Sequence, residues 1–383
     1  MEYRKLGKTD IDISVISLGC EGFSEKSKEE CYEMFKYAYE RGINYIDMYA
    51  SDPVLRENIG YAINKLGRSN IYIQGHLCSA WKNGQYYRTR NIDDTKKAFE
   101  DMLKQMNTSY IDVGIIHYCD EISDFENIMN GPIIEYAKDL LDKGIIKMIG
   151  ISTHNQRVAI KSIESGIIDV IMLSVNPAYD MLPENEDVDI LFEDKTFDRV
   201  YMGIDPLRDE MYKLSETNKV SITVMKPFSG GLLLDKKRSP FGKALTPVQC
   251  ISYALDRLGV ACVLVGVKNI RELEESLKYL VSKKEERDYS EIISKAPKKE
   301  FDGSCMYCGH CAPCIKGINV AKVNKFLDLA ITEGKVLETV REHYDVLDHH
   351  AGECIACGKC LKNCPFGVDI IGKMKQARNV FGI

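Results

Sequence analysis

Short apolar runs alternate with amphipathic stretches over most of the chain, between residues 13 and 282. The runs are near-continuous in Ile, Val, Leu and Met, as expected for parallel strands that are buried on both faces. They predict strands at Ile13–Gly19, Ile43–Asp47, Asn70–Gly75, Tyr110–His117, Ile146–Ser152, Asp169–Asn176, Ser221–Pro227 and Val260–Val267. Between them, apolar residues recur every three or four positions, which is typical of helices with one buried face. These stretches predict helices at Lys28–Arg41, Leu55–Leu66, Asp93–Met106, Ile133–Lys143, Arg157–Ser165, Arg208–Thr217, Pro247–Leu258 and Arg271–Val281.

Eight strands, each followed by a helix, are the count of a closed (β/α)8 TIM barrel, a fold of the α/β class. An open, doubly wound sheet is the alternative. That fold normally has a Gly-rich turn after its first strand, and Gly-Cys-Glu-Gly-Phe at 19–23 does not match it. Tyr3–Asp12 predicts a hairpin that caps the barrel floor. We therefore predict a barrel domain over residues 1–284.

The pattern changes after the last predicted helix. Residues 285–301 are charged and contain Pro297, which predicts a linker. Helical periodicity then returns at Val320–Ile331 and Glu338–Leu347. We expect residues 302–383 to form a small, mainly helical domain.

Eight cysteines in this last part form two tight groups. The first comprises Cys305, Cys308, Cys311 and Cys314, and the second comprises Cys354, Cys357, Cys360 and Cys364. The second group, which Pro365 follows, has the C-x2-C-x2-C-x3-C-P spacing of a 4Fe–4S cluster. The first has two residues instead of three before its last cysteine, and Ile315 instead of Pro. Two such runs predict two 4Fe–4S clusters and a protein that transfers single electrons.

Other uses of the cysteines fit less well. Zinc usually binds two separated pairs of ligands. Disulfides are not expected, because the N-terminus lacks the apolar segment of a secretory signal and no stretch of about 20 apolar residues could span a membrane. Six further cysteines are scattered through apolar stretches, at positions 20, 31, 78, 119, 250 and 262. This usage suits a reducing cytoplasm, with each of the six a small buried side chain.

By analogy with two-cluster ferredoxins, the fourth cysteine of each run can bind the other cluster. Cys364 would then join the first three cysteines of the first group, and Cys314 would join the first three of the second. Four lysines lie near these runs, at positions 316, 322, 359 and 362. They either offset the charge of the anionic clusters or are simply solvated surface residues.

The composition limits which kinds of binding partner are expected. Hydrophobic residues make up 45% of the 383 residues, enough for a large core, and the formal net charge is −6. No Lys- or Arg-rich face is evident, which argues against nucleic acid as the main partner.

Titratable side chains gather at the predicted strand ends, where barrels of this kind carry their chemistry. Three of the seven histidines, His76, His117 and His154, lie within two residues of a strand end. Histidine is the natural proton shuttle near neutral pH. Asp47, Ser152, Asn176 and Lys226 also stand at strand ends, so we predict a functional site at this mouth.

Several motifs resemble those of the aldo-keto reductases. They are Tyr3-Arg4-Lys5-Leu6-Gly7, Gly42-Ile43-Asn44-Tyr45-Ile46-Asp47, Tyr110–His117, Gly150-Ile151-Ser152-Thr153-His154 and Pro227-Phe228-Ser229-Gly230-Gly231-Leu232. The resemblance covers residues 1 to about 280 and implies the same barrel. The tail resembles helical two-cluster ferredoxin domains, so the whole chain resembles the iron–sulfur-containing branch of that family.

The resemblance implies an active-site tetrad of Asp, Tyr, Lys and His, of which Asp47 and His117 match. Asp52 stands where the tyrosine is expected, and His76 stands where the lysine is expected. A free aspartate is ionised at pH 7, so Asp52 could donate a proton only with a strongly raised pKa. Tyr49 could substitute if the loop is rearranged, but His76 and His117 are better candidates for general acid and base. Lys226 could stabilise an oxyanion or contact a cofactor.

The resemblance also implies NADP(H). Ser229 and Gly230 suit a pyrophosphate at a backbone turn, and Lys268 and Arg271 could bind the 2′-phosphate. Ser152 and Asn176 are further expected cofactor contacts. Three expected residues are replaced: by Met172 on the sixth strand, by Met225 where an aromatic should stack on the nicotinamide, and by Glu275 for a late asparagine.

Two long loops are expected to cover the mouth. Cys78–Arg90 contains Trp81, Tyr86, Tyr87, Arg88 and Arg90, which suit an anionic or ring-bearing substrate or form an ordinary surface loop. Pro177–Pro206 is long and acidic, with Glu184, Glu186, Asp187, Asp189, Glu193 and Asp194. Loops of such length are usually lids or binding loops.

Three functions remain open. The first is an oxidoreductase in which electrons pass through the clusters to or from a small organic substrate, with a ferredoxin- or flavodoxin-type donor. The second is an electron-transfer or docking subunit with a non-catalytic barrel. The third is a histidine-based acid–base or metal-dependent lyase with structural clusters. The sequence does not name the substrate, the direction of reaction, the electron donor or the oligomeric state.

Overall fold

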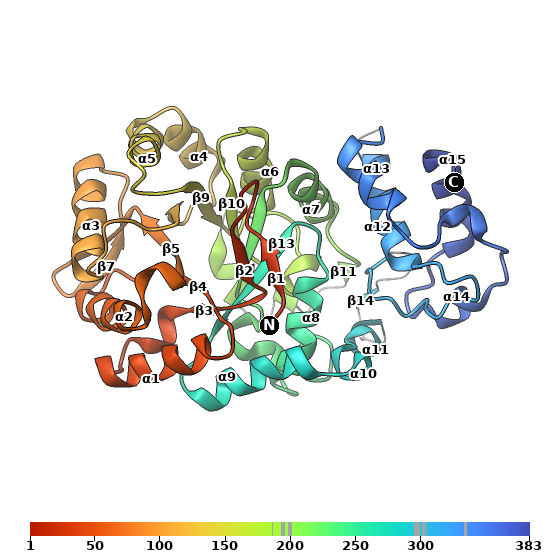
Figure 1. Ribbon diagram of the computed structural model, residues 1–383, viewed down its shortest axis with the longest axis horizontal. Coiled ribbons are helices and arrows are strands. Elements are labelled where there is room, and N and C mark those ends of the chain that lie inside the picture. The colour runs from red at the N-terminus through yellow and green to blue at the C-terminus, as the bar shows by residue number, and fades with distance from the viewer. Residues whose placement is uncertain are drawn as a thin grey trace.

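The computed structural model describes residues 1–383 apart from 186, 193–195, 198–200, 295–298, 301, 302, 304, 333 and 334. Eight parallel strands close into a barrel in the order β10-β12-β13-β3-β4-β5-β8-β9 (Figure 1). Their bounds are β3 (Ile16–Gly19), β4 (Tyr45–Met48), β5 (Tyr72–Leu77), β8 (Val113–Ile116), β9 (Met148–Thr153), β10 (Val170–Ser174), β12 (Ser221–Met225) and β13 (Val260–Gly266). The predicted (β/α)8 barrel is therefore confirmed, and the open sheet is excluded.

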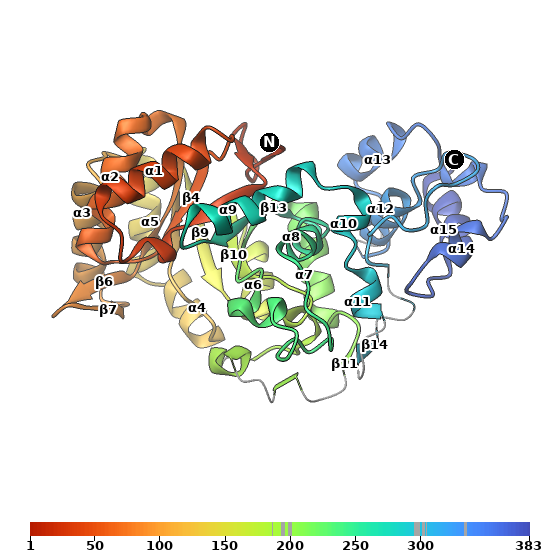
Figure 2. The ribbon, with the colours of Figure 1, turned by 90° about the horizontal axis from the view of Figure 1, so that it is seen from below.

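All eight predicted barrel helices are present. They are α1 (Lys28–Tyr39), α2 (Pro53–Leu66), α3 (Ile92–Gln105), α5 (Pro132–Asp142), α6 (Gln156–Glu164), α7 (Pro206–Asn218), α8 (Pro247–Leu255) and α9 (Ile270–Leu277). The structure adds a short helix, α4 (Ile122–Met129), in the loop after β8. Side-chain caps fix the starts of several helices: Ser27 with Glu30, and Thr246 with Gln249, form capping boxes at α1 and α8. Figure 2 shows the helices around the barrel.

Two hairpins flank the barrel. Strands β1 (Tyr3–Lys5) and β2 (Asp12–Ser14) form the predicted hairpin at the floor. Strands β6 (Ser79–Lys82) and β7 (Gln85–Arg88) form a second hairpin after β5, where the sequence predicted only a loop. Its turn is Asn83-Gly84, and both residues have positive φ angles, of 53° and 75°. An Asn-Gly pair between short strands is a hairpin signal that was overlooked.

The C-terminal region lies beside the barrel, along α7 and α8 (Figures 1 and 2). It is built from α12 (Val320–Thr332), α13 (Glu338–Asp345), α14 (Lys359–Asn363) and α15 (Ile370–Phe381), which include both predicted helices. Stacking of Tyr344 on Phe381, with ring centroids 3.9 Å apart, helps to form its own core. Two short helices, α10 (Lys284–Arg287) and α11 (Ser290–Ser294), occupy part of the predicted linker.

The first cysteine group meets the barrel near its floor, not its mouth. Arg257 donates to the carbonyl oxygen of Met306 at 2.7 Å, and Lys325 pairs with Glu216 at 3.2 Å. Arg257 precedes β13, and Glu216 lies near the end of α7, so both belong to the floor end. The seven residues of β13 separate this end from the mouth. At about 3.3 Å per residue, that is roughly 20 Å.

Within the described part of the chain, no helix combines the length and the apolar character needed to span a bilayer.

Candidate active site

A cavity of about 1070 Å³ opens at the mouth of the barrel. Asp47, His76, His117, His154 and Lys226 all line it. These residues come from five different segments, and the barrel brings them together because parallel strands all end at the same rim. The structure therefore collects the predicted titratable groups in one place.

A chain of four side chains runs along one wall. Asp47 Oδ1 lies 2.9 Å from His76 Nε2, His76 Nδ1 lies 2.8 Å from His117 Nδ1, and His117 Nε2 lies 2.8 Å from the Tyr86 hydroxyl. Gln74 also donates to Asp47, at 2.7 Å. Asp47 and His76 are buried, so the chain is held away from bulk water. We name it the Asp47 relay.

The directions of the hydrogen bonds in the Asp47 relay follow from the protonation state of His117. Burial, together with the charges of His76 and Arg90, holds the pKa of His117 well below its usual value, so this imidazole is neutral at pH 7. An ionised Asp47 only accepts, so His76 donates from Nε2 and accepts at Nδ1 when it too is neutral. His117 then donates from Nδ1 and accepts the Tyr86 proton at Nε2. The tautomers assigned in this way align all three hydrogen bonds in one direction.

Of the two replacements considered for the tetrad tyrosine, Tyr49 reaches the cavity and Asp52 does not. Asp52 caps α2 by accepting a hydrogen bond from the backbone N–H of Leu55 at 3.1 Å, and it is not among the described residues that line the cavity. A capping carboxylate stabilises the helix start, so the role of acid expected for Asp52 does not agree with its position. Tyr49 does line the cavity and stacks on His117, with ring centroids 5.9 Å apart. Burial raises the pKa of Tyr49, and the charge of Glu21 raises it further.

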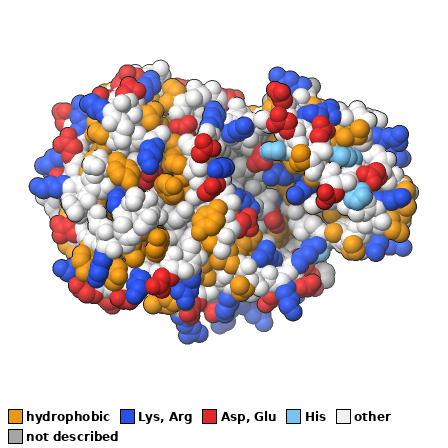
Figure 3. Space-filling model, viewed as in Figure 1, with side chains coloured by type: hydrophobic (Ala, Val, Ile, Leu, Met, Phe, Trp, Pro, Cys, Tyr) orange, Lys and Arg blue, Asp and Glu red, His pale blue; other side chains and the backbone are white. Residues whose placement is uncertain are grey.

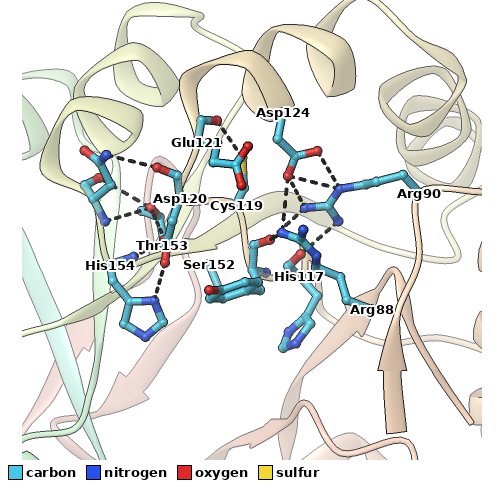
Figure 4. A network of polar contacts seen from close by, with 12 residues as sticks. Arg88, Arg90, His117, Cys119, Asp120, Glu121, Asp124, Ser152, Thr153 and His154 are labelled. Atoms are coloured by element: carbon cyan, nitrogen blue, oxygen red, sulfur yellow. Dashed lines mark hydrogen bonds and ion pairs between the residues drawn. The ribbon is translucent and has the colours of Figure 1, made fainter. Parts of the chain in front are cut away.

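A second chain lies on the neighbouring strand ends (Figure 4). Asp120 Oδ2 is 2.9 Å from His154 Nδ1, and His154 Nε2 is 2.9 Å from Lys226 Nζ. Thr153 and the backbone N–H of His154 also donate to Asp120, at 2.9 and 2.6 Å. We name this chain the Asp120 relay.

Burial sets the protonation of the Asp120 relay. It lowers the pKa of Lys226 to about 8, against the opposing charges of Asp120 and Glu21. It also lowers the pKa of His154, although Asp120 acts in the other direction. Burial alone would raise the pKa of Asp120, but hydrogen bonds from His154 bring it below its usual value. At pH 7 the relay therefore contains a carboxylate, a neutral imidazole and a mainly protonated amine.

The arginines of the β6–β7 region hold the hairpin in place. Arg90 pairs with Asp124 at 2.6 Å and donates to the carbonyl oxygens of His117 and Tyr118 at 2.9 and 2.7 Å (Figure 4). Arg88 lies 3.6 Å from Asp124 and donates to Tyr118. Because Asp124 already pairs with both, the expectation of an anion site at these arginines is not supported.

The expected cofactor contacts are only partly brought together. Ser152, Gly230 and Lys268 line the cavity, whereas Ser229, Asn176 and Arg271 are not among the described lining residues. Asn176 instead holds the loop after β12, by donating to the Lys226 carbonyl oxygen at 2.9 Å. Gly230 has a φ of 61° and open space where a Cβ would stand, so its backbone could approach a ligand closely.

The far end of the cavity does not suit a 2′-phosphate. Lys268 lines it together with Glu272 and Glu275, and the Glu272 carboxylate accepts from the Lys268 backbone N–H at 2.8 Å. Two carboxylates beside one lysine repel an additional dianion. Met172 and Met225 line the opposite part, and they offer no hydrogen bond to a nicotinamide amide. The phosphate and amide contacts that the resemblance implied for NADP(H) are therefore only partly present.

The acidic loop between β10 and α7 lies only partly within the described residues. Glu186, Glu193 and Asp194 fall outside them. Glu184 forms an ion pair with Arg157, with Nη2 and Oε1 2.8 Å apart. Farther along, β11 (Tyr201–Met202) pairs with β14 (Lys299–Glu300), so the segment next to α7 is tied to the start of the C-terminal region.

The six scattered cysteines are all buried, as expected of small apolar side chains. Among the described residues, no three Cys, His, Asp or Glu side chains converge closely enough to hold a single metal ion. Four cysteines nevertheless line one small cavity in the C-terminal region: Cys314, Cys354, Cys357 and Cys360.

Two residues of the site, Gln74 and Asp120, were missed in the sequence, and a third, Tyr86, was named only within a loop expected to cover the mouth. Gln74 is two positions before His76 on β5, so the alternation of a strand places both side chains on one face. Asp120 follows the strand end that contains His117. Tyr86 depends on the overlooked hairpin, and only the Asn83-Gly84 turn could have indicated its position.

Comparisons with known proteins agree with this architecture. The model of the aldo/keto reductase family matches residues 15–296, so the chain belongs to that family. An uncharacterized oxidoreductase of Bacillus subtilis, YqkF, is 26% identical over 290 residues, covering 74% of this chain and 83% of its own. The aldo-keto reductase YhdN of the same organism is 30% identical over 166 residues, covering 40% of this chain and 47% of its own. Aldo-keto reductase AKR11C1 from Bacillus halodurans, solved in its holo form, has a TM-score of 0.60 and 21% identity, and the match covers 78% of this chain and 97% of that structure.

The chain is thus an aldo-keto reductase-like oxidoreductase. Members of this family typically use NADP(H), which makes the poor fit at Lys268, Glu272 and Glu275 a departure from the family.

Proposed function

We propose that this protein is an iron–sulfur oxidoreductase of the aldo/keto reductase family, in which residues 302–383 form a ferredoxin-like domain with two 4Fe–4S clusters. The observation that carries the proposal is the small cavity lined by four cysteines. It combines Cys314 from the first group with three cysteines of the second. This is the crossed set that a two-cluster ferredoxin arrangement requires.

Interactions among the thiols support the same grouping. Burial raises the pKa of Cys360, and Cys354 and Cys314 raise it further through their charges. Burial likewise raises the pKa of Cys311 to about 11, with Cys305 and Cys364 adding to the effect and Cys360 adding least. Cys364 therefore interacts with Cys311, and Cys314 with Cys360, which supports the crossed arrangement.

The donor set suits iron–sulfur clusters rather than a single ion. Each thiolate of a cubane binds a different iron, so four such thiolates stand farther apart than the ligands of one ion. Two side chains already place nitrogen atoms beside the first group: Asn324 Nδ2 donates to Cys305 Sγ at 3.4 Å, and His310 Nδ1 lies 3.3 Å from Cys308 Sγ. Such contacts stabilise thiolates and tune cluster potentials. When bound, the clusters would supply or accept single electrons.

At the mouth, we assign proton transfer to His117. Its Nε2 atom accepts a hydrogen bond from an exposed tyrosine, so a substrate hydroxyl that displaces Tyr86 would donate to it directly. His76 and Asp47 position the His117 ring and stabilise the imidazolium when His117 takes up a proton. Lys226 places a cation on the opposite wall, where it can bind a carboxylate or stabilise an oxyanion. A small organic substrate with an oxygen function is therefore the class that this cavity suits.

The proposal is tested by anaerobic reconstitution of the full chain. We expect about eight irons per chain, four for each cubane, and broad visible absorption that bleaches on reduction. Fewer than two irons per chain would overturn it. Titration with NADPH then shows which reductant the clusters accept. We expect no bleaching with NADPH and full bleaching with a low-potential one-electron donor.

One observation favours a second candidate function. The first cysteine group meets the floor end of β13, roughly 20 Å by strand length from the mouth, and not the cavity itself. In the second candidate the clusters serve electron transfer or stability, and the barrel acts separately as an acid–base catalyst or not at all. Single-turnover reduction of a carbonyl compound by pre-reduced protein, without any other donor, would exclude it.

A further inference from the structure

The second cysteine group lies at an outward-facing end of the C-terminal region. Cys357 is exposed, and the two segments that carry Cys314 and Cys357 also expose apolar side chains. Ile315, Ile355 and Leu361 have 68%, 56% and 37% of their surface exposed. Lys316, Lys359 and Lys362 are exposed around them. We name this surface, formed by three apolar residues and three lysines, the lysine pole.

Lysines outnumber carboxylates at the lysine pole. Residues 311–319 and 354–368 contain these three lysines and no aspartate or glutamate, and the exposed Glu353 and Asp369 directly flank the second segment. Among the described residues, no carboxylate forms an ion pair with any of the three. The chain as a whole has a net charge of −6, so the pole is a local basic surface on an acidic protein.

The first cysteine group differs because it faces the barrel. Met306, beside Cys305, accepts from Arg257. Lys284 donates to the Gly309 carbonyl oxygen at 2.7 Å, and His310 lies 2.7 Å from Asp288. Of the eight grouped cysteines, all of which the structure describes, Cys357 of the second group is the exposed one. Figures 1 and 3 show α14 at the end of the molecule away from the barrel, with apolar side chains and lysines or arginines at that end.

We propose that the lysine pole is the docking site for an acidic one-electron carrier protein, and that electrons enter at the cluster held by Cys314, Cys354, Cys357 and Cys360. This inference rests on the proposed function. In each encounter the reduced carrier loses one electron and this cluster gains it, without any transfer of atoms. The electron then passes to the other cluster, which lies nearer the barrel.

Physical chemistry favours this partner over others. Transient electron-transfer complexes bury little surface and need fast dissociation, which suits a small apolar centre with a charged rim. Complementary charge accelerates the encounter without requiring tight binding. Three exposed apolar side chains are few for insertion into a lipid surface, and the pole has no long amphipathic helix of the kind that lies on membranes.

The test uses the full, iron-loaded protein in anaerobic stopped flow, with an acidic ferredoxin reduced by dithionite as the probe. We expect the triple variant K316E/K359E/K362E to lower the second-order rate of cluster reduction at least tenfold at low salt. The wild-type rate should fall as salt rises, and the variant should be nearly insensitive to salt. Reduction by dithionite alone should be equal in the two proteins.

A matched control carries the same charge change elsewhere. Lys8, Lys97 and Lys104 are exposed, and the last two lie on α3 at the opposite end of the molecule (Figure 1). The variant K8E/K97E/K104E should keep the rate within about twofold, because steering acts over about one Debye length. Equal loss in both variants would overturn the docking site. If the first variant fails to load iron, K316Q/K359Q/K362Q replaces it, and an unchanged rate in that variant has the same consequence.

Three further outcomes are distinguishable. If the wild-type protein binds no iron, the proposed function fails and the docking site fails with it. If the wild-type protein binds iron but the lysine variants react with ferredoxin at the normal rate, only the docking site fails. Binding to phosphatidylglycerol vesicles that depends on these lysines, without any change in the ferredoxin rate, would assign the pole to a membrane surface instead.

Discussion

The polar side chains of the barrel mouth and the cysteines of the C-terminal region differ in how many hydrogen-bond partners the protein gives them. At the mouth, Asp47, His76, His117 and Tyr86 are bonded to one another, so the site is organised before any ligand arrives. In the C-terminal region, side-chain nitrogen atoms of described residues lie within hydrogen-bond distance of two of the eight grouped sulfurs, those of Cys305 and Cys308. The mouth therefore depends on protein packing, whereas the cysteine region depends on what it binds.

Removing iron should give the largest effect, and this effect should be confined to the C-terminal region. We expect anaerobic chelation to lower hydrogen-exchange protection of α12 and α15 at least tenfold, because metal binding and folding are coupled in small domains. Protection of β5 and β8 should be unchanged, since a closed barrel does not depend on the clusters. Exchange is read by mass spectrometry, region by region. Equal protection of the C-terminal helices with and without iron would remove the contrast.

Substitution of His117 should act only at the mouth. We expect H117A to lower kcat/KM by about 10²- to 10⁴-fold, the usual contribution of a general acid–base group. Iron content and cluster spectrum should not change. His349, an exposed histidine of the C-terminal region, provides the matched control, and H349A should retain activity. A normal kcat/KM in H117A would exclude the Asp47 relay from catalysis and favour a non-catalytic barrel.

Much of this contrast could be predicted from the sequence. Continuous apolar runs predicted all eight strands, because strands buried on both faces have little choice of residue type. Cysteine spacing predicts two clusters, since a cubane fixes the local geometry of its loop, and this stays a prediction. The hydrogen bonds between different strand ends could not be predicted from the sequence. Asp120 contacts His154 only because of the barrel register, and Tyr86 contacts His117 only because of an unpredicted hairpin. Docking of the C-terminal region at the floor depends on Arg257, which has no distinctive local pattern.

Lys226 should have a smaller effect, on how the free energy of unfolding depends on pH. Its pKa is lowered by burial to about 8, below the value of about 10.4 in an unfolded chain. Between these values the unfolded state binds more protons than the folded state, so the free energy of unfolding should rise with pH from about 8 to 10.4. Below pH 8 the cost of burying the cation is fully present. The variant K226M should therefore be more stable at pH 7, by on the order of 1 kcal/mol, and should lose this rise.

Urea unfolding at pH 7 and pH 10 measures both parts of this prediction. The exposed Lys8 gives a control, K8M, that should keep the wild-type pH dependence. Identical pH dependence in K226M and wild type would mean that Lys226 does not titrate in this window. Lys226 would then stay protonated through this window, and burial would not weaken the cation of the Asp120 relay.

Tyr86 should give the smallest effect and the finest test of the contrast between the two regions. Y86F removes one hydrogen bond to His117, and a neutral bond of this kind contributes about 0.5–1.5 kcal/mol. Tyr86 is 43% exposed, so water can replace the lost hydroxyl, and we expect less than about tenfold change in kcat/KM. A loss as large as that of H117A would instead make the Tyr86 hydroxyl the proton donor of the reaction. The hairpin would then supply the tyrosine that Asp52 replaces in the family tetrad, and the mouth would be complete only when β6 and β7 are closed over it.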